Sequence, residues 1–149
     1  MKKLIVVLVL AFTYSTGYSQ TPAAKPDTVA IELTKSISFN WSVSQSRIVR
    51  DETFNKLKAN KKAIKPQLYS MISSDSVIVL NVCFKKGVVR KGDMAFNLLD
   101  ALYNVPYAAA FKQKFDLIYP PCTVPDGLYD FIETNRDSIG PWLRTYYAQ

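Results

Sequence analysis

Apolar and polar side chains alternate along residues 29–43 for almost their whole length. The apolar members of this row are Val29, Ile31, Leu33, Ile37, Phe39, Trp41 and Val43. A period of two is typical of a β-strand that buries one face. Lys35 interrupts the row, and no Gly or Asn-Gly pair is present there to form a tight hairpin turn. We therefore expect one bent strand across residues 29–43, in preference to two short strands that meet at a corner.

Residues 77–84 predict a second strand, because β-branched residues dominate a nearly continuous apolar run. Such a run is typical of a central strand that is covered on both faces. Elsewhere, apolar residues recur at the three- and four-residue spacing of helices. Helices are expected over about 51–63 and 66–73, after Asp93, Pro106 and Pro125, and over 141–147, with breaks at Pro66 and Gly140-Pro141. The pattern predicts an α+β fold, in which a small sheet packs against about five helices.

The first 20 residues predict export. Lys2 and Lys3 precede an apolar run at residues 4–12, and Gly17 and Ser19 have the spacing that a signal peptidase recognises. A membrane anchor is the alternative, but this run is far shorter than the roughly 20 residues that a spanning helix needs. We expect a signal peptide over residues 1–19, a flexible lead over 20–28 and a single domain over 29–149. The mature protein is then periplasmic or extracellular, without an integral membrane span.

Cys83 and Cys122 are the only cysteines of the chain. An exported chain meets an oxidising compartment, in which two cysteines commonly pair. The alternative is two separate thiols, with Cys83 a small buried residue of its apolar run. We expect a disulfide between Cys83 and Cys122.

Positive charge predominates in this sequence, with a formal net charge of +7. Two lysine-rich stretches supply a candidate basic contact face, made of Lys56, Lys58, Lys62, Lys85, Lys86 and Arg90. Such a face favours an anionic envelope component or an acidic protein as partner. The export signal argues against nucleic acid. The alternative is that these charges only face water, as charge runs on helices commonly do.

The chain contains no histidine, which excludes Ser–His and Cys–His nucleophilic pairs and histidine-bound zinc. Its five glycines form no phosphate-binding loop. We therefore expect no metal and no cofactor. Carboxylate catalysis remains possible, with the candidates Asp93 with Asp100, and Asp126 with Asp130 and Glu133. A Ser–Lys dyad is chemically possible as well, but both residue types are too abundant for a match to be informative. Asp93 and Asp126 equally fit a structural role in the first turn of a helix.

Aromatic residues gather toward the C-terminus, and among them Tyr129, Trp142 and Tyr146 are candidate contact residues. Burial in the core is the alternative for each of them. Together these features favour an exported binding or interaction protein without catalytic activity. A small envelope hydrolase that uses paired carboxylates and an exported enzyme inhibitor are the alternatives. The ligand and the oligomeric state stay open.

Overall fold

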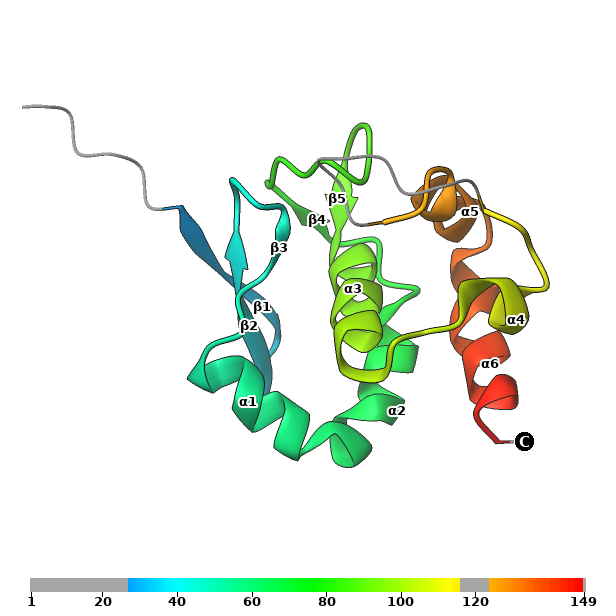
Figure 1. Ribbon diagram of the computed structural model, residues 1–149, viewed down its shortest axis with the longest axis horizontal. Helices are drawn as coiled ribbons and strands as arrows, with labels where there is room; N and C mark the ends of the chain where they lie inside the picture. The colour runs from blue at the N-terminus through cyan, green and yellow to red at the C-terminus, as the bar shows by residue number, and fades with distance from the viewer. Residues whose placement is uncertain (1–26, 116–123, 149) are drawn as a thin grey trace, which may run out of the picture.

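A computed structural model describes residues 27–115 and 124–148 of the chain (Figure 1). Within these residues the fold is α+β, as the sequence pattern predicts, with six helices and two small antiparallel sheets. One sheet has the strand order β1-β2-β3 and the other pairs β4 with β5. The signal-peptide prediction for residues 1–19 lies outside the described residues.

Strands β1 (Thr28–Thr34) and β2 (Ile37–Ser42) form an antiparallel hairpin in which Ile31 faces Phe39. The expectation of a single bent strand is therefore wrong. The Thr34 hydroxyl oxygen accepts the backbone N–H groups of Ser36 at 3.3 Å and Ile37 at 3.1 Å. The threonine side chain thus stabilises a tight turn that contains no glycine. The predicted apolar face is confirmed from Ile31 to Trp41, where the odd-numbered residues apart from Lys35 are buried, whereas Val29 is 39% exposed.

Strand β1 begins within residues 20–28, the range predicted to be a flexible lead. The Asp27 carboxylate accepts the Ser42 hydroxyl at 2.7 Å and the Ser44 backbone N–H at 2.9 Å. These hydrogen bonds lower the pKa of Asp27. Residues 27 and 28 therefore belong to the folded domain rather than to a flexible lead.

Residues 77–84 do not form the predicted central strand. Only β4 (Val77–Ile78) is regular, and it pairs with β5 (Val89–Arg90). Burial alternates along the segment, with Val79 99% exposed and Val82 8% exposed. The Phe84 ring packs edge-on against Trp41, with ring centroids 5.7 Å apart. The segment therefore covers the core with one face and leaves the other in solvent, because no element of the described chain lies over it.

Helices α1 (Glu52–Ala59) and α2 (Lys61–Met71) meet at Asn60, and α5 (Leu128–Thr134) and α6 (Arg136–Tyr146) meet at Asn135. Each asparagine amide donates at 2.9 Å to the carbonyl oxygen four residues earlier, which belongs to Lys56 or Phe131. Asparagine side chains compete with helix continuation in this way. The predicted breaks at Pro66 and Gly140-Pro141 are wrong, since both prolines lie inside helices.

Close packing of two helices explains why α6 continues through Gly140. A Cβ atom at this position would lie 2.4 Å from the Tyr69 carbonyl oxygen of α2. The glycine thus allows the backbones of α2 and α6 to approach, and tertiary packing outweighs its low helix propensity.

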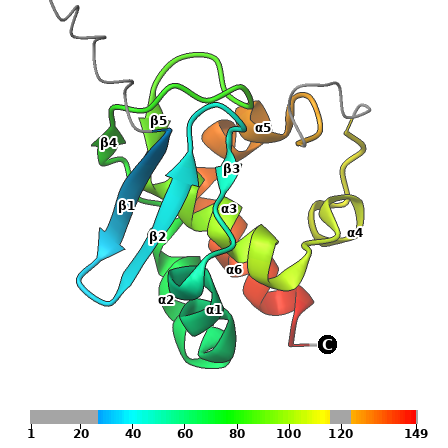
Figure 2. The ribbon, with the colours of Figure 1, turned by 60° about the vertical axis from the view of Figure 1, so that its left-hand side comes forward.

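Helix α3 (Lys91–Tyr103) lies between the β1-β2-β3 sheet and α6 (Figures 1 and 2). Its residues Met94, Ala95, Phe96, Leu98 and Leu99 are at most 1% exposed. The short helix α4 (Tyr107–Phe111) follows it and lies beside α6. None of the helices in the described ranges is long and apolar enough to span a membrane.

Candidate functional site

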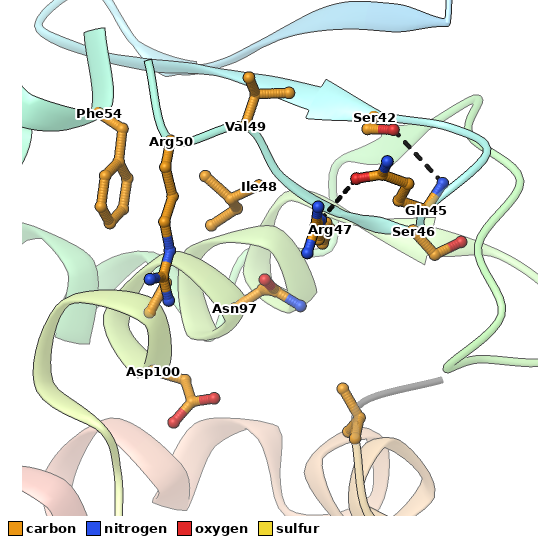
Figure 3. A pocket seen from close by; sticks show the side chains of 12 residues that line it. Ser42, Gln45, Ser46, Arg47, Ile48, Val49, Arg50, Phe54, Asn97 and Asp100 are labelled. Atoms are coloured by element: carbon orange, nitrogen blue, oxygen red, sulfur yellow. Dashed lines mark hydrogen bonds between the residues drawn. The ribbon is translucent and has the colours of Figure 1, made fainter. Parts of the chain in front are cut away.

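A polar pocket of about 480 Å³ lies between α3 and the segment that leads from β2 through β3 (Arg47–Ile48) to α1 (Figure 3). Arg47 and Arg50 line it from the sheet side, and Asn97 and Asp100 line it from α3. Phe54 of α1 closes one end. The pocket therefore combines charged groups from two separate elements with an apolar wall.

Local structure fixes the position of Arg50. The next residue, Asp51, caps α1 by accepting the Phe54 backbone N–H at 3.0 Å. Its second carboxylate oxygen accepts the side-chain amide of Asn40, in β2, at 2.6 Å. The Asn40 hydrogen bond, followed by the cap, lowers the pKa of Asp51. Because this carboxylate ties the sheet to α1, the backbone that carries Arg50 is held at both ends.

The two arginines of the pocket have no acidic partner in the described part of the chain. Arg47 donates from Nε to the Gln45 side-chain oxygen at 2.6 Å. Arg50 makes no hydrogen bond or ion pair with any described residue, and its side chain extends toward α3 near Asn97 and Asp100 (Figure 3). Both side chains are exposed. Two guanidinium groups are thus available to an external ligand.

Asp100 is the one carboxylate that lines this pocket among the described residues. Its Oδ1 accepts the Val105 backbone N–H at 2.9 Å, and its Oδ2 accepts the Tyr107 hydroxyl in a short hydrogen bond. Burial raises the pKa of Asp100, and the two hydrogen bonds partly oppose that shift. Burial, followed by the charge of the same carboxylate, raises the pKa of Tyr107. Asp100 therefore holds the α3–α4 connection, and the pocket keeps an excess of positive charge.

The six residues of the predicted basic face do not form one face. Lys56 and Lys58 of α1 and Lys62 of α2 are exposed, and Lys86 is exposed in the β4–β5 loop. Figures 1 and 2 show α1 and this loop at opposite ends of the molecule. The Lys85 side chain is 6% exposed and that of Arg90 is 28% exposed, and both side chains form ion pairs within the domain. The prediction that all six residues lie on a single face is therefore wrong.

Lys85 and Arg90 belong to an ion-pair cluster with Asp93, Glu133 and Arg136, and the exposed Asp75 lies at its edge, 3.6 Å from Arg90 Nη1 and 3.7 Å from Arg136 Nε. The Asp93 carboxylate is fully buried and lies 2.7 Å from both Lys85 Nζ and Arg136 Nη2. Glu133 lies 2.5 Å from Lys85 Nζ and 3.0 Å from Arg90 Nε, and it also contacts Arg136. Burial opposes ionisation of Glu133, but Lys85 and Arg136 lower its pKa to about 2.

The ion-pair cluster decides the role of the predicted carboxylates. Asp93 also accepts the Arg90 backbone N–H at 2.8 Å, which confirms its structural place in the first turn of α3. Asp93 lies in the ion-pair cluster and Asp100 lines the pocket, so this pair does not converge on one site. Asp126 and Asp130 are exposed, whereas Glu133 is held by three cations. The described residues bring no pair of predicted catalytic carboxylates together in the pocket.

The three candidate aromatic residues also separate. Tyr129 is a core residue, 3% exposed, and its ring centroid lies 4.3 Å from that of Phe84. Trp142 and Tyr146 line a shallow hollow of about 450 Å³ between α4 and α6. Trp142 is 39% exposed and stacks on Phe131, with ring centroids 6.1 Å apart. Two of the three residues thus share a surface, and the third stabilises the core.

The predicted disulfide between Cys83 and Cys122 stays a prediction, because Cys122 lies outside the described residues.

Comparison with protein-family models, with curated proteins and with solved structures finds no match for this chain.

Sequence reasoning missed Arg47 and Arg50 as functional candidates, since it looked for lysine-rich runs. One signal was present: both arginines lie between the strand pattern of residues 29–43 and the helix predicted from about residue 51. Such connections are where binding residues concentrate.

Proposed function

We propose that this chain is an exported binding protein without catalytic activity, and that its ligand is an anion held by Arg47 and Arg50. The observation that carries this proposal is the pair of guanidinium groups on a 480 Å³ pocket, neither of which has an acidic partner among the described residues. Arg90 and Arg136, in contrast, are both ion-paired to Glu133.

The chemistry of the two side chains favours a carboxylate or phosphate group. Guanidinium presents a planar set of donors that matches both groups in bidentate fashion. A partly enclosed site beside Ile48 and Phe54 reduces the solvent screening of such contacts. The volume lies within the range of small-molecule pockets, roughly 300 to 1,000 Å³. A small organic anion, or the acidic group of a larger envelope component, fits these properties.

The alternative of a hydrolase receives less support from this geometry. Glycoside hydrolysis by carboxylates needs two of them, about 5 to 10 Å apart across the substrate. Asp100 is the single carboxylate of the described pocket lining, and its two oxygens already accept hydrogen bonds. The pocket therefore favours binding over acid–base chemistry. No described contact bears on the alternative of an exported inhibitor.

The binding proposal is tested by calorimetric titration of the protein with inorganic phosphate, sulfate and citrate. The double variant Arg47→Gln with Arg50→Gln should bind the tightest of these anions at least about tenfold more weakly. The matched control is Lys56→Gln with Lys58→Gln, which removes the same charge from exposed positions of α1. This control should change the affinity less than about twofold. An equal loss in both variants would show that net charge, rather than the pocket, attracts the anion.

Export is tested separately, by fractionation of the native cells and intact-mass measurement. The basic head, the apolar run and the Gly17–Ser19 spacing predict a mature N-terminus at Gln20, within a few residues. An uncleaved chain recovered from the cytoplasm would contradict this part of the proposal and leave the anion site to be judged by titration.

A further inference from the structure

We propose that the ligand of the pocket is an amino-carboxylate, which carries an ammonium group in addition to the anionic group held by Arg47 and Arg50. This inference rests on the proposed anion site and names the class of its ligand. The guanidinium donors line the pocket from the sheet side, and Asn97 and Asp100 line it from α3 with oxygen acceptors (Figure 3). A ligand that matches both walls needs an acceptor group at one end and a donor group at the other.

The two acceptor side chains of α3 lie on one face of the helix, because they are three residues apart. The Asn97 amide donates from Nδ2 to the Tyr129 hydroxyl at 3.2 Å, and its Oδ1 accepts from no described residue. The two oxygens of Asp100 accept one hydrogen bond each, from Val105 and Tyr107. A carboxylate has about four acceptor positions. Both half-buried side chains therefore keep acceptor capacity for a donor in the pocket.

The charge of Asp100 identifies that donor as an ammonium group. Asp100 forms no ion pair with any described residue, although its partial burial disfavours an uncompensated charge. Its structural role does not require the charge, because an asparagine could also serve the Val105 N–H and the Tyr107 hydroxyl. An ammonium group supplies three N–H donors and the opposite charge, so it compensates Asp100 as a neutral hydroxyl would not.

Calorimetric titration with glutarate and glutamate separates this proposal from simple attraction of anions. Both probes have the same dicarboxylate chain, and glutamate adds an ammonium group that lies closer to one carboxylate than to the other. Because glutamate has the less negative net charge, attraction by positive charge alone would favour glutarate. We expect the opposite order, with glutamate bound about threefold to tenfold more tightly, as for a partly exposed charge-assisted contact. Equal affinities, or tighter binding of glutarate, would overturn the proposal.

The variant Asp100→Asn assigns the preference to one side chain. It should bind glutamate about threefold to tenfold more weakly than the wild type does and no longer prefer it to glutarate. Sulfate has no ammonium group, so its binding should not weaken, which also checks that the pocket stays folded. The control Asp137→Asn removes an exposed carboxylate of α6 outside the pocket lining and should keep the preference for glutamate. An Asp100→Asn protein that keeps the full preference would contradict the assignment.

The double variant Arg47→Gln with Arg50→Gln distinguishes failure of this inference from failure of the anion site. At a correct anion site, this variant weakens the binding of sulfate, glutarate and glutamate together. If it does so while the wild type shows no preference for glutamate, the anion site stands and the amino-carboxylate is wrong. If none of the three probes binds the wild type, the anion site and the amino-carboxylate are both wrong.

Discussion

The pocket and the ion-pair cluster use the same kinds of side chain in opposite ways. In the cluster, Lys85, Arg90 and Arg136 surround two carboxylates, and the centre of the group is buried. In the pocket, Arg47 and Arg50 are exposed, and Asp100, the one carboxylate of the described lining, is already held by its own hydrogen bonds. One group joins the β4–β5 region to α3, α5 and α6, and the other leaves its charges available to a ligand.

The difference shows that ion pairing within the fold, rather than the density of charge along the sequence, distinguishes two kinds of cation. Structural cations are paired with carboxylates, and candidate ligand-binding cations are not. A buried charge is stable only where other groups compensate it. An exposed arginine needs no such compensation and contributes little to stability. The two groups should therefore respond differently to mutation, to acid and to loss of a neighbouring charge.

The largest expected effect is that of Arg136→Ala on the cluster. This change removes one of the two cations at the fully buried Asp93, and it also removes the donor to the Ile72 carbonyl oxygen. Breaking a buried pair from one side costs about 3 to 5 kcal/mol. Urea denaturation should show a loss of this size. The same measurement on Arg50→Ala should give a change within about 0.5 kcal/mol. Comparable losses of stability in the two variants would show that the cluster and the pocket do not differ in their structural role.

Much of the fold follows from the periodicity of the sequence, and the errors have identifiable physical causes. The alternation along residues 29–43 predicts the buried face of β1 and β2, but Thr34 makes the turn that was not expected. Pro66 and Pro141 lie inside helices that begin after Asn60 and Asn135, and close packing at Gly140 brings α6 against α2. Local propensity is a weak guide where tertiary contacts compete with it.

The candidate site was harder to predict, because it depends on which charges meet in space. Lys85 and Lys86 are neighbours in sequence, yet one is buried in the cluster and the other is exposed. Glu133, which joins Lys85 to Arg136, lies 48 residues from Lys85. No local pattern contains that information, so a prediction from charge runs placed Lys85 and Arg90 on a surface.

Acid should weaken the cluster through Glu133. Its folded pKa of about 2 lies below the ordinary value of 4.5, so its contribution is complete above pH 4.5 and is lost as the pH falls toward 2. After allowance for its partial exposure, this contribution is about 1 to 2 kcal/mol. Glu133→Gln should be less stable than the wild type by that amount at pH 6, and equally stable near pH 2.

The control Glu52→Gln, at an exposed pair with Lys56, should change stability by less than about 0.5 kcal/mol at either pH. A Glu133→Gln deficit that does not vary with pH would show that lost packing, rather than ionisation, causes it.

The smallest expected effect concerns Asp100, whose charge opposes the binding of an anion beside Arg50. Burial raises the pKa of this carboxyl, so it becomes neutral at a higher pH than an ordinary aspartate as acid is added. Sulfate is a suitable probe, because its charge stays constant between pH 7 and pH 3.5. Its affinity should increase as the pH falls through the raised pKa of Asp100.

Asp100→Asn should bind sulfate about threefold more tightly than the wild type at pH 7, a gain of about 0.7 kcal/mol. The variant should also lose the increase at acid pH. Asparagine keeps an oxygen for the Val105 N–H, and its amide can donate to the Tyr107 hydroxyl, so the α3–α4 connection should persist. A sulfate affinity that falls in the variant would contradict this prediction, because it would show that Asp100 supports the anion site rather than opposes it.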